Sequence, residues 1–264
     1  MAVILFISAH QDDETLSMGA AIINHVAAGH KVYSGCITDG SASGIRGTNG
    51  IPSDTKSFIN ARNTEMINSL RELGASFIEG STARLKDGTL STNVTSTFPG
   101  NDGNDLRTVN PLVLARVRDL LKQVSINSGV AIKDIRVKTH SHHDAHPDHR
   151  AVCQAVLYLL NVTKEINDVR LYVSPGQWTD TQVYKGKVYQ NASQLDANTE
   201  LNTANAQRIN TASLNYVKQG TTPTWGGSGT STYGIGYFSV QTLFDTVNQK
   251  RCSYYHVPPV CTLP

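Results

Sequence analysis

One stretch near the start of the chain decides the fold: VILFISAHQDDE, residues 3–14. Its first five residues are apolar, which predicts a strand buried on both faces, as in the centre of a parallel sheet. The side chains that follow can bind a metal or move a proton: His10, Asp12, Asp13 and Glu14. Because ligands bind at the carboxyl ends of the strands in open α/β sheets, we expect a functional site here.

The rest of the chain alternates between strand and helix patterns. Runs of apolar residues predict further strands at 31–38, 76–79, 134–140 and 169–173. Amphipathic or helix-like patterns predict helices at 14–28, 54–73, 111–121, 150–160 and 198–219. Two stretches without clear periodicity predict a long surface excursion and a mobile glycine-rich loop, at 81–109 and 226–236.

This alternation predicts an α/β fold with a Rossmann-like, mostly parallel sheet flanked by helices in a single domain. A length of 264 residues agrees with one large domain. We expect residues 1–180 to form the core that carries the functional site. Residues 181–264 are then a C-terminal segment that packs on this core and offers loops to a substrate. A dinucleotide-binding function is not expected, because no Gly-x-Gly-x-x-Gly follows the first strand.

Composition narrows the class of partner. The net charge of +2, without a run of lysine or arginine, argues against a nucleic-acid partner. No apolar stretch reaches the ~20 residues of a membrane span, so no transmembrane segment is expected. Charged residues make up only 17% of the chain, below the ~25% of an average soluble protein, and Ser, Thr and Asn are common instead. This composition slightly favours an extracytoplasmic protein over a cytoplasmic one. No signal peptide is visible before the first strand, although Met1 could equally replace a removed leader. The oligomeric state stays open.

The four cysteines bear on the same question of compartment. Cys36 lies in an apolar strand pattern and Cys153 on an apolar helix face, so both are expected to be buried free thiols. Cys252 and Cys261 flank a short proline-containing segment, and they either close a small loop as a disulfide or remain two thiols. The sequence leaves these two alternatives equally open.

Two polar clusters stand at strand ends and carry the functional argument. The first is His10-x-Asp12-Asp13, and the second is HPDH at residues 146–149, after the strand predicted at 134–140. Histidine nitrogens and carboxylate oxygens together suit Zn²⁺, which catalytic sites hold with three protein ligands and a water. Alone, the acidic run is often a solvated helix N-terminus, and a His-rich loop can be surface decoration. Their occurrence together at two strand ends favours a metal site.

Both clusters resemble the motifs of the LmbE-like, or PIG-L-type, zinc-dependent N-deacetylases. AHQDDE at residues 9–14 is similar to the A-H-P-D-D-E signature of that family, and residues 146–149 look like its H-P-D-H motif. The resemblance covers roughly residues 2–175 in the right order. Gln11 departs from it, because the family usually has a proline there. The implied fold is the same α/β fold that the strand and helix patterns predict.

Shorter matches lie between the two clusters and are weaker alone. RNTE at residues 62–65, followed by LG at 73–74, is similar to the R-x-x-E…L-G helix of the family, and DG at 87–88 is similar to a later short motif. By position, the resemblance implies that four residues lie beside the metal ligands or contact the substrate: Glu14, Arg62, Glu65 and Asp87.

The resemblance also implies a role for each residue of the two clusters. The three ligands of one zinc ion per chain match His10, Asp13 and His149. Asp12 matches the general base that takes a proton from the attacking water. His146 matches the residue that stabilises the oxyanion or protonates the leaving amine, and Asp148 the residue that orients His146. The chemistry agrees, because a base and an acid on either side of a metal-polarised carbonyl complete amide hydrolysis.

The resemblance therefore implies an enzyme, a zinc-dependent N-deacetylase that converts an N-acetylglucosamine-type sugar or glycoconjugate to the free amine and acetate. One alternative is an amide hydrolase acting on a non-sugar N-acyl natural product, and another is a non-catalytic carbohydrate-binding relative. The presence of both Asp12 and His146 argues against the second. Three further polar residues follow the second strand: His142, His143 and Asp144. They could bind a second metal or the substrate, or they could form a polar approach to the first metal, which we favour.

Overall fold

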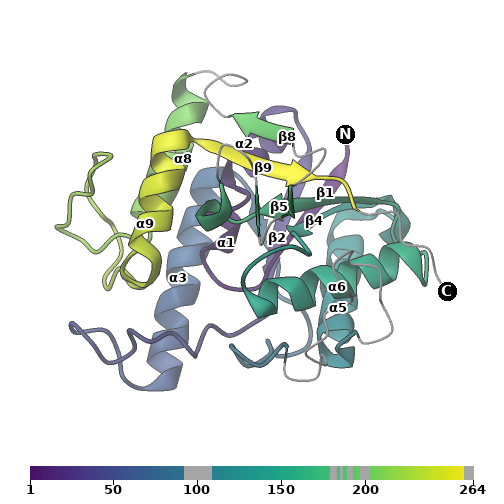
Figure 1. The fold of residues 1–264 in the computed structure, drawn as a ribbon, viewed down its shortest axis with the longest axis horizontal. Helices are drawn as coiled ribbons and strands as arrows, with labels where there is room; N and C mark the ends of the chain where they lie inside the picture. Colours follow the sequence, from purple (N-terminus) through teal and green to yellow (C-terminus); the bar gives the residue numbers. More distant parts are fainter. Residues whose placement is uncertain (92–108, 179–182, 185–186, 189–192, 197–202, 259–264) are drawn as a thin grey trace.

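The computed structural model describes residues 1–91, 109–178, 183–184, 187–188, 193–196 and 203–258 (Figure 1). The strands of the main sheet are β1 (Val3–Ser8), β2 (Lys31–Cys36), β3 (Ser76–Phe77), β4 (Ile135–His140), β5 (Asp168–Val173), β8 (Ser193–Asp196) and β9 (Cys252–His256). Their spatial order is β3-β2-β1-β4-β5-β9-β8. The first five are parallel, whereas β9 and β8 join antiparallel. The predicted α/β fold with a mostly parallel sheet is confirmed.

Strand β1 lies at the centre of this sheet, as its apolar sequence predicts. It pairs with β2 on one side and β4 on the other, and all six of its residues are buried. Successive side chains point to opposite faces of a strand. Ile4 and Phe6 therefore enter one hydrophobic core, and Leu5 and Ile7 enter the other.

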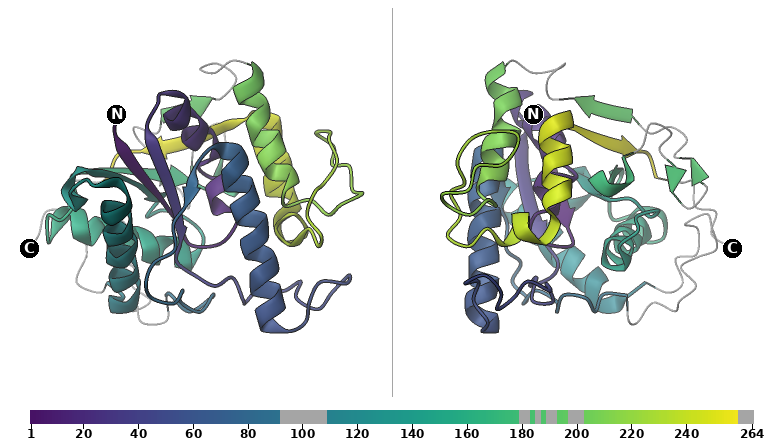
Figure 2. Two further views of the ribbon diagram at one scale, coloured as in Figure 1. Left: turned by 180° about the vertical axis from the view of Figure 1, so that it is seen from behind. Right: turned by 60° about the vertical axis from the view of Figure 1, so that its left-hand side comes forward.

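Helices cover both faces of the sheet. They are α1 (Asp13–Leu16), α2 (Gly19–Ala27), α3 (Thr55–Leu73), α5 (Pro111–Ser128), α6 (Pro147–Asn161), α8 (Thr203–Leu214) and α9 (Ile235–Lys250), with short 3₁₀ turns η1 (Ile132–Asp134) and η2 (Pro175–Gln177). Figures 1 and 2 show α3, α8 and α9 on one side of the sheet and α5 and α6 on the other. The layers are thus helix, sheet and helix. Among the described helices, none is long and apolar enough to span a membrane.

Helix α3 shows how local sequence sets the ends of an element. The Asp54 carboxylate accepts the backbone N–H of Ser57 at 2.8 Å, which caps the first turn. Gly74 ends the helix with a φ of 81°, a conformation that glycine adopts without strain. The helix predicted at 54–73 is confirmed.

The helix predicted at 14–28 is wrong in one respect, because the chain breaks it into α1 and α2. Met18 has φ −124° and ψ −1°, outside the helical region. Leu16 and Met18 are both in the same core. In a continuous helix, residues two apart point in nearly opposite directions, so the break lets both side chains be buried together.

The C-terminal segment extends the main sheet. Helix α8 falls within the predicted helical region 198–219, whereas α9 and β9 were not predicted. The stretch 226–236, predicted to be mobile, is fixed by hydrogen bonds such as those of the Ser231 N–H to the Val217 carbonyl (3.0 Å) and of the Gly236 N–H to the Glu65 carboxylate (3.0 Å). A separate antiparallel pair is formed by β6 (Val183–Tyr184) and β7 (Lys187–Val188).

The cysteines of the described residues are all buried. Cys36 and Cys153 lie in the core, as predicted, and Cys252 begins β9. Cys261 lies outside the described residues, so the disulfide between Cys252 and Cys261 stays a prediction.

Candidate metal and catalytic site

Polar side chains gather at the carboxyl ends of β1, β4 and β5. From β1 the chain adds β2 and β3 on one side, and later adds β4 and β5 on the other. Such a reversal of strand order leaves a crevice at the strand ends, where open α/β sheets bind ligands. His10 follows β1, Ser141 follows β4 and Ser174 follows β5, so this crevice holds the first predicted cluster and lies beside the second.

His10, Asp13 and His149 bring three donor atoms together. The His10 Nδ1 lies 3.2 Å from the His149 Nε2 and 3.3 Å from the Asp13 Oδ2. The His149 Nε2 lies 3.3 Å from the same Asp13 oxygen. In a tetrahedral zinc site with bonds of about 2.0 Å, neighbouring ligand atoms are about 3.3 Å apart. The three predicted ligands therefore fit one Zn²⁺ and leave its fourth position open.

The described residues also contain the donor groupings His10–His146–His149, Asp13–His140–His149 and His10–Asp87–Asp148. His140 lies near Asp13 and His149, yet its Nε2 accepts the Ala9 N–H at 3.0 Å, so that lone pair is used. Its ring stacks on the His149 ring at 3.8 Å and thereby holds it. His140 was not predicted as a site residue. It is the last residue of a strand, and nothing in the local sequence pattern distinguishes it.

Carboxylates lie behind both predicted histidine ligands. The His10 Nε2 is 3.1 Å from the Asp87 Oδ1 and 3.5 Å from the Asp148 Oδ2. The His149 Nδ1 is 3.1 Å from the Asp144 Oδ2. Metal-binding imidazoles commonly donate their second N–H to a carboxylate, which fixes the tautomer and the ring orientation. This arrangement leaves the His10 Nδ1 and the His149 Nε2 as the two free lone pairs.

The protonation of the site in the metal-free protein follows from these contacts. Burial lowers the pKa of His149, but the carboxylates of Asp13 and Asp144 outweigh it and raise this pKa to about 10. Burial raises the pKa of Asp13, but His149 and His140 hold it well below its usual value. A metal must therefore displace a proton from His149, which makes binding weaker at low pH.

Asp12 and Asp13 point in different directions. Asp13 turns to the histidines, whereas the Asp12 carboxylate lines the cavity described below and accepts a hydrogen bond from the Arg62 Nη2 at 3.1 Å. Asp12 has a φ of 138°, an uncommon value for a residue with a side chain. Burial raises the pKa of Asp12 to about 8, although the Arg62 cation opposes this.

His146 lies at the start of α6, on the rim of the site. Its Nδ1 accepts the backbone N–H of Asp148 at 3.2 Å, so the neutral ring carries its hydrogen on Nε2. Its ring centroid lies 4.7 Å from that of His10 and 4.8 Å from that of His149. Burial lowers the pKa of His146 to about 4, so the ring is neutral at pH 7.

Asp148 contacts His146 through its backbone N–H, which the His146 Nδ1 accepts. The carboxylate accepts the Gly88 N–H at 3.0 Å and lies against His10. The carboxylate therefore has partners other than the His146 ring, and an orienting role of Asp148 stays a prediction.

The four residues predicted beside the ligands or substrate divide into two groups. Arg62 and Asp87 line the cavity. Glu65 does not line it, and its carboxylate accepts the Ser231 hydroxyl and two backbone N–H groups at the start of α9. Glu14 is fully buried behind Asp12 and does not line the cavity either. Its carboxylate accepts the Asp12 N–H at 3.1 Å, so its contact is with the protein backbone.

Gln11, where the family usually has proline, joins three parts of the site. Its Nε2 donates to the Asp39 carbonyl and to the Asn63 Oδ1, both at 3.0 Å. Its own carbonyl accepts the Arg62 Nη2 at 2.9 Å. Hydrogen bonds of Gln11 thus connect the turn after β1 to the loop after β2 and to α3, at the position where the family usually has proline.

A cavity of about 670 Å³ opens in front of the predicted ligands. Polar groups of Asp12, Arg62 and Asp87 line one part of it. Aliphatic side chains line the rest: Leu16, Pro147, Pro175, Val240 and Leu243. Val240 has φ −145° and ψ 47° and kinks α9 at the cavity, so the C-terminal segment contributes part of its wall.

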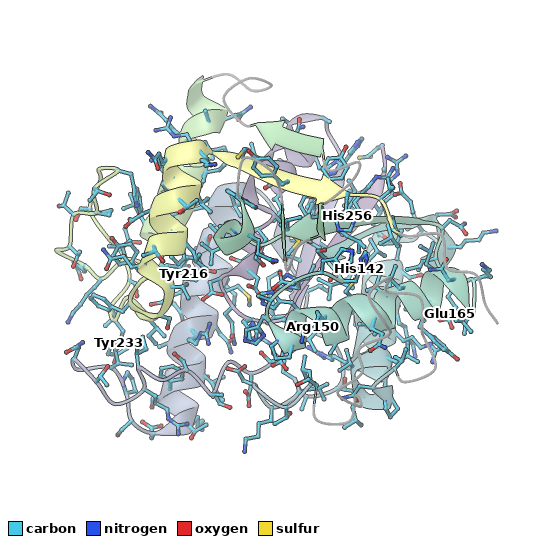
Figure 3. The ribbon with its side chains drawn as sticks, in the orientation of Figure 1. His142, Arg150, Glu165, Tyr216, Tyr233 and His256 are labelled. Carbon is cyan, nitrogen blue, oxygen red and sulfur yellow. The ribbon has the colours of Figure 1, made fainter. Side chains whose placement is uncertain are left out.

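A second pair of histidines lies after β4 and at the end of β9. The His142 ring, which follows β4, is 5.3 Å from the ring of His256, the last residue of β9 (Figure 3). The His256 Nδ1 donates to the Val257 carbonyl at 3.0 Å, so its Nε2 accepts the Ser141 hydroxyl at 2.8 Å. Neither His142 nor His143 belongs to a donor group tight enough for a metal within the described ranges.

Comparison with known proteins relates this geometry to a family. In the solved structures, a deacetylase triple mutant of the teicoplanin biosynthetic pathway is 18% identical with a TM-score of 0.59, covering 99% of each chain. The A40926 pseudoaglycone deacetylase Dbv21 is 17% identical with a TM-score of 0.60, also covering 99% of each chain. A zinc-inhibited form of teicoplanin deacetylase Orf2 is 19% identical with a TM-score of 0.55, covering 97% of this chain and 96% of that one. At these identities the likeness shows a shared fold.

Comparison of the sequence with family profiles identifies the family as well as the fold. Curated protein sequences contain no match to this chain. The profile of the PIG-L family, described as GlcNAc-PI de-N-acetylase, matches residues 5–160, which is more than half of the chain and includes both polar clusters. The chain therefore belongs to the PIG-L family, as the resemblance of its motifs predicts.

Proposed function

We propose that the protein is a zinc-dependent N-deacetylase that hydrolyses the N-acetyl group of an N-acetylglucosamine-type sugar or glycoconjugate. One observation carries this proposal: His10, Asp13 and His149 converge with zinc-like spacing at a cavity lined by Asp12 and His146. Membership of the PIG-L family supports the reaction.

His10, Asp13 and His149 would hold the metal, and two nitrogens with one carboxylate oxygen are a donor set that suits Zn²⁺. When bound, such an ion polarises an amide carbonyl and lowers the pKa of a water molecule to about 7. The carboxylates of Asp87 and Asp144 hold the two imidazoles in the tautomers that this binding needs.

Asp12 acts as the general base in this proposal. Its carboxylate removes a proton from the water that attacks the carbonyl carbon, while Arg62 holds the carboxylate in place. As the C–N bond breaks, the leaving nitrogen needs one proton, which the protonated Asp12 can return. Burial raises the pKa of Asp12, but the Arg62 cation lowers it and so favours the ionised carboxylate that the first step needs.

His146 acts as a hydrogen-bond donor. Its Nδ1 is occupied by the Asp148 N–H, so its Nε2–H is the group that can face the carbonyl oxygen as negative charge develops there. With a pKa of about 4, the ring is neutral at pH 7, which favours stabilising the oxyanion over donating a full proton.

The cavity supports a substrate larger than the acetyl group alone. Its volume of about 670 Å³ lies within the range of about 300–1,000 Å³ of sites that bind drug-sized ligands. Arg62 and Asp87 can bind sugar hydroxyls, whereas Leu16, Val240 and Leu243 offer an apolar wall. This aliphatic wall favours a second candidate function, hydrolysis of a non-sugar N-acyl natural product.

Acetate release tests the proposal. The panel contains N-acetylglucosamine, its glycosides with polar and with apolar aglycones, and N-acetyl amines without a sugar, each with added Zn²⁺ and with a chelator. We expect metal-dependent release, fastest from glycosides. Release only from sugar-free amides would favour the second candidate. Binding of sugars without any acetate release would contradict both and favour a non-catalytic binding protein.

A further inference from the structure

A buried carboxylate connects the general base to the C-terminal segment. The Glu14 Oε2 accepts the Asp12 N–H at 3.1 Å. Its other oxygen accepts the Thr15 hydroxyl at 2.7 Å and the Tyr216 hydroxyl in a short hydrogen bond. Glu14, Thr15 and Tyr216 have no exposed surface. Tyr216 follows α8 and lies outside residues 5–160, which match the family profile.

The backbone at Asp12 needs such support. With φ 138° and ψ −28°, it is in a region that residues with side chains rarely adopt, and it stays there only if its surroundings hold it. The Asp12 carbonyl accepts the Thr15 and Leu16 N–H groups, and its N–H is held by Glu14. This conformation turns the Asp12 side chain away from Asp13 and toward Arg62.

Tyr216 is itself held firmly between α9 and α1 (Figure 3). Its ring packs on Phe244 of α9 with centroids 5.1 Å apart. Its backbone carbonyl accepts the Tyr237 N–H at 3.3 Å. A side chain at Gly236 would collide with the Tyr216 ring, so glycine there lets the start of α9 approach closely. The hydroxyl therefore has a defined position relative to Glu14.

We propose that Tyr216 is a positioning residue for the general base and acts on Asp12 through Glu14. The Tyr216 and Thr15 hydroxyls hold one Glu14 oxygen, which directs the other toward the Asp12 N–H. Without the Tyr216 hydroxyl, the Glu14 carboxylate can rotate and the Asp12 backbone loses its acceptor. The Asp12 carboxylate then moves relative to Arg62 and the cavity. This inference rests on the proposed function of Asp12.

Tyr216→Phe removes only the hydroxyl, and Tyr237→Phe is a matched control. Tyr237 packs on the same Phe244 with centroids 6.0 Å apart, and its hydroxyl lies 3.4 Å from the Asp245 carboxylate, away from Glu14. We expect Tyr216→Phe to lower kcat by about 10- to 100-fold, because small misplacements of a catalytic group have effects of this size. KM and zinc content should stay at the values of the unsubstituted protein, whereas Tm should fall modestly, because the buried Glu14 carboxylate loses one hydrogen-bond donor. An equal loss of kcat in Tyr237→Phe, or a loss of kcat that accompanies a fall in zinc content, would overturn the proposal.

Two further measurements separate this inference from the proposed function. Hydrogen exchange of the Asp12 amide should speed up in Tyr216→Phe and not in Tyr237→Phe, and this readout needs no substrate. In a Glu14→Gln background, the added Tyr216→Phe change should have little further effect on kcat, because the two residues act in one chain. Unchanged Asp12 exchange would refute the inference even if acetate is released. Absence of release from the unsubstituted protein would refute the function while the exchange result still decides the inference.

Discussion

Asp144→Asn should weaken metal binding although Asp144 is not a ligand. The Asp144 Oδ1 accepts the backbone N–H of His146 at 2.9 Å. The Asp144 Oδ2 lies 3.1 Å from the His149 Nδ1 and accepts the Ser174 hydroxyl. An amide has one acceptor oxygen and one NH₂ group, so it can accept on one side only. If the oxygen stays with the His146 N–H, the NH₂ faces the His149 Nδ1 and favours the tautomer with hydrogen on Nε2. That hydrogen occupies the lone pair that the metal needs.

The expected size of the effect follows from this geometry. Loss of a carboxylate partner behind a metal-binding histidine typically costs 10- to 100-fold in metal affinity, which is about 1.4–2.7 kcal/mol. The alternative amide orientation keeps the His149 tautomer but leaves the partly buried backbone N–H of His146 facing an NH₂ group, which costs about 0.5–1.5 kcal/mol. Metal binding that requires this orientation carries the same cost.

A competition titration of Zn²⁺ against a chromogenic chelator measures this affinity. Asp134→Asn, an exposed change in η1, is the control and should leave affinity unchanged. The Tm of both metal-free variants shows whether the fold is kept. If Asp144→Asn keeps full zinc affinity with an intact fold, the assignment of His149 Nε2 as a ligand held by Asp144 is wrong.

Three further predictions concern stability. Burial lowers the pKa of His256 to about 4, against ~6.5 in the unfolded chain, so the unfolded chain binds more protons between these values. The free energy of unfolding should then fall by up to about 3 kcal/mol as the pH drops from 6.5 to 4. Denaturant titrations at several pH values should show a weaker pH dependence for His256→Gln than for the unsubstituted protein, and an equal pH dependence would refute the prediction. Glu65→Gln should lower the free energy of unfolding by about 1–3 kcal/mol. The Glu65 carboxylate accepts the Ser231 hydroxyl and two backbone N–H groups of α9, and the amide nitrogen of glutamine cannot accept a hydrogen bond. An unchanged urea midpoint would contradict this prediction. Gly40→Ala should cost about 1–3 kcal/mol, because Gly40 has φ 71° and a Cβ there would collide with Gln11; a wild-type Tm would show that the loop relaxes freely.

Much of the fold can be predicted from local sequence. The five apolar residues that begin β1 indicate a strand buried on both faces, and the structure places this strand between β2 and β4. The two polar clusters follow β1 and β4, and parallel neighbouring strands bring their carboxyl ends to one edge. The proximity of His10 and His149 therefore follows from the order of strands alone.

Other parts depend on contacts between residues far apart in the sequence. Tyr216 meets Glu14 across 202 residues, and Ser231 meets Glu65 across 166. No local pattern indicates such partners. The glycine-rich stretch 226–236 suggests mobility because glycine is permissive, yet its backbone is held by hydrogen bonds to the rest of the protein.

The placement of Asp148 shows the limit of position-by-position inference. A motif predicts that Asp148 and His146 interact, because they are two residues apart at the start of a helix. It does not say which atom makes the contact. The Asp148 carboxylate lies near His10 and accepts the Gly88 N–H, and both partners come from other loops. The Asp148 backbone N–H donates to the His146 Nδ1.

The zinc content and turnover of Asp12→Asn test the central claim most directly. If Asp13 binds the metal and Asp12 is the base, Asp12→Asn should keep stoichiometric zinc while its kcat for acetate release falls by ~10²–10⁴, with KM nearly unchanged. Asp13→Ala, measured alongside, should lose the zinc. Turnover of Asp12→Asn near the wild-type rate, or loss of zinc as severe as in Asp13→Ala, would contradict the roles assigned to this pair.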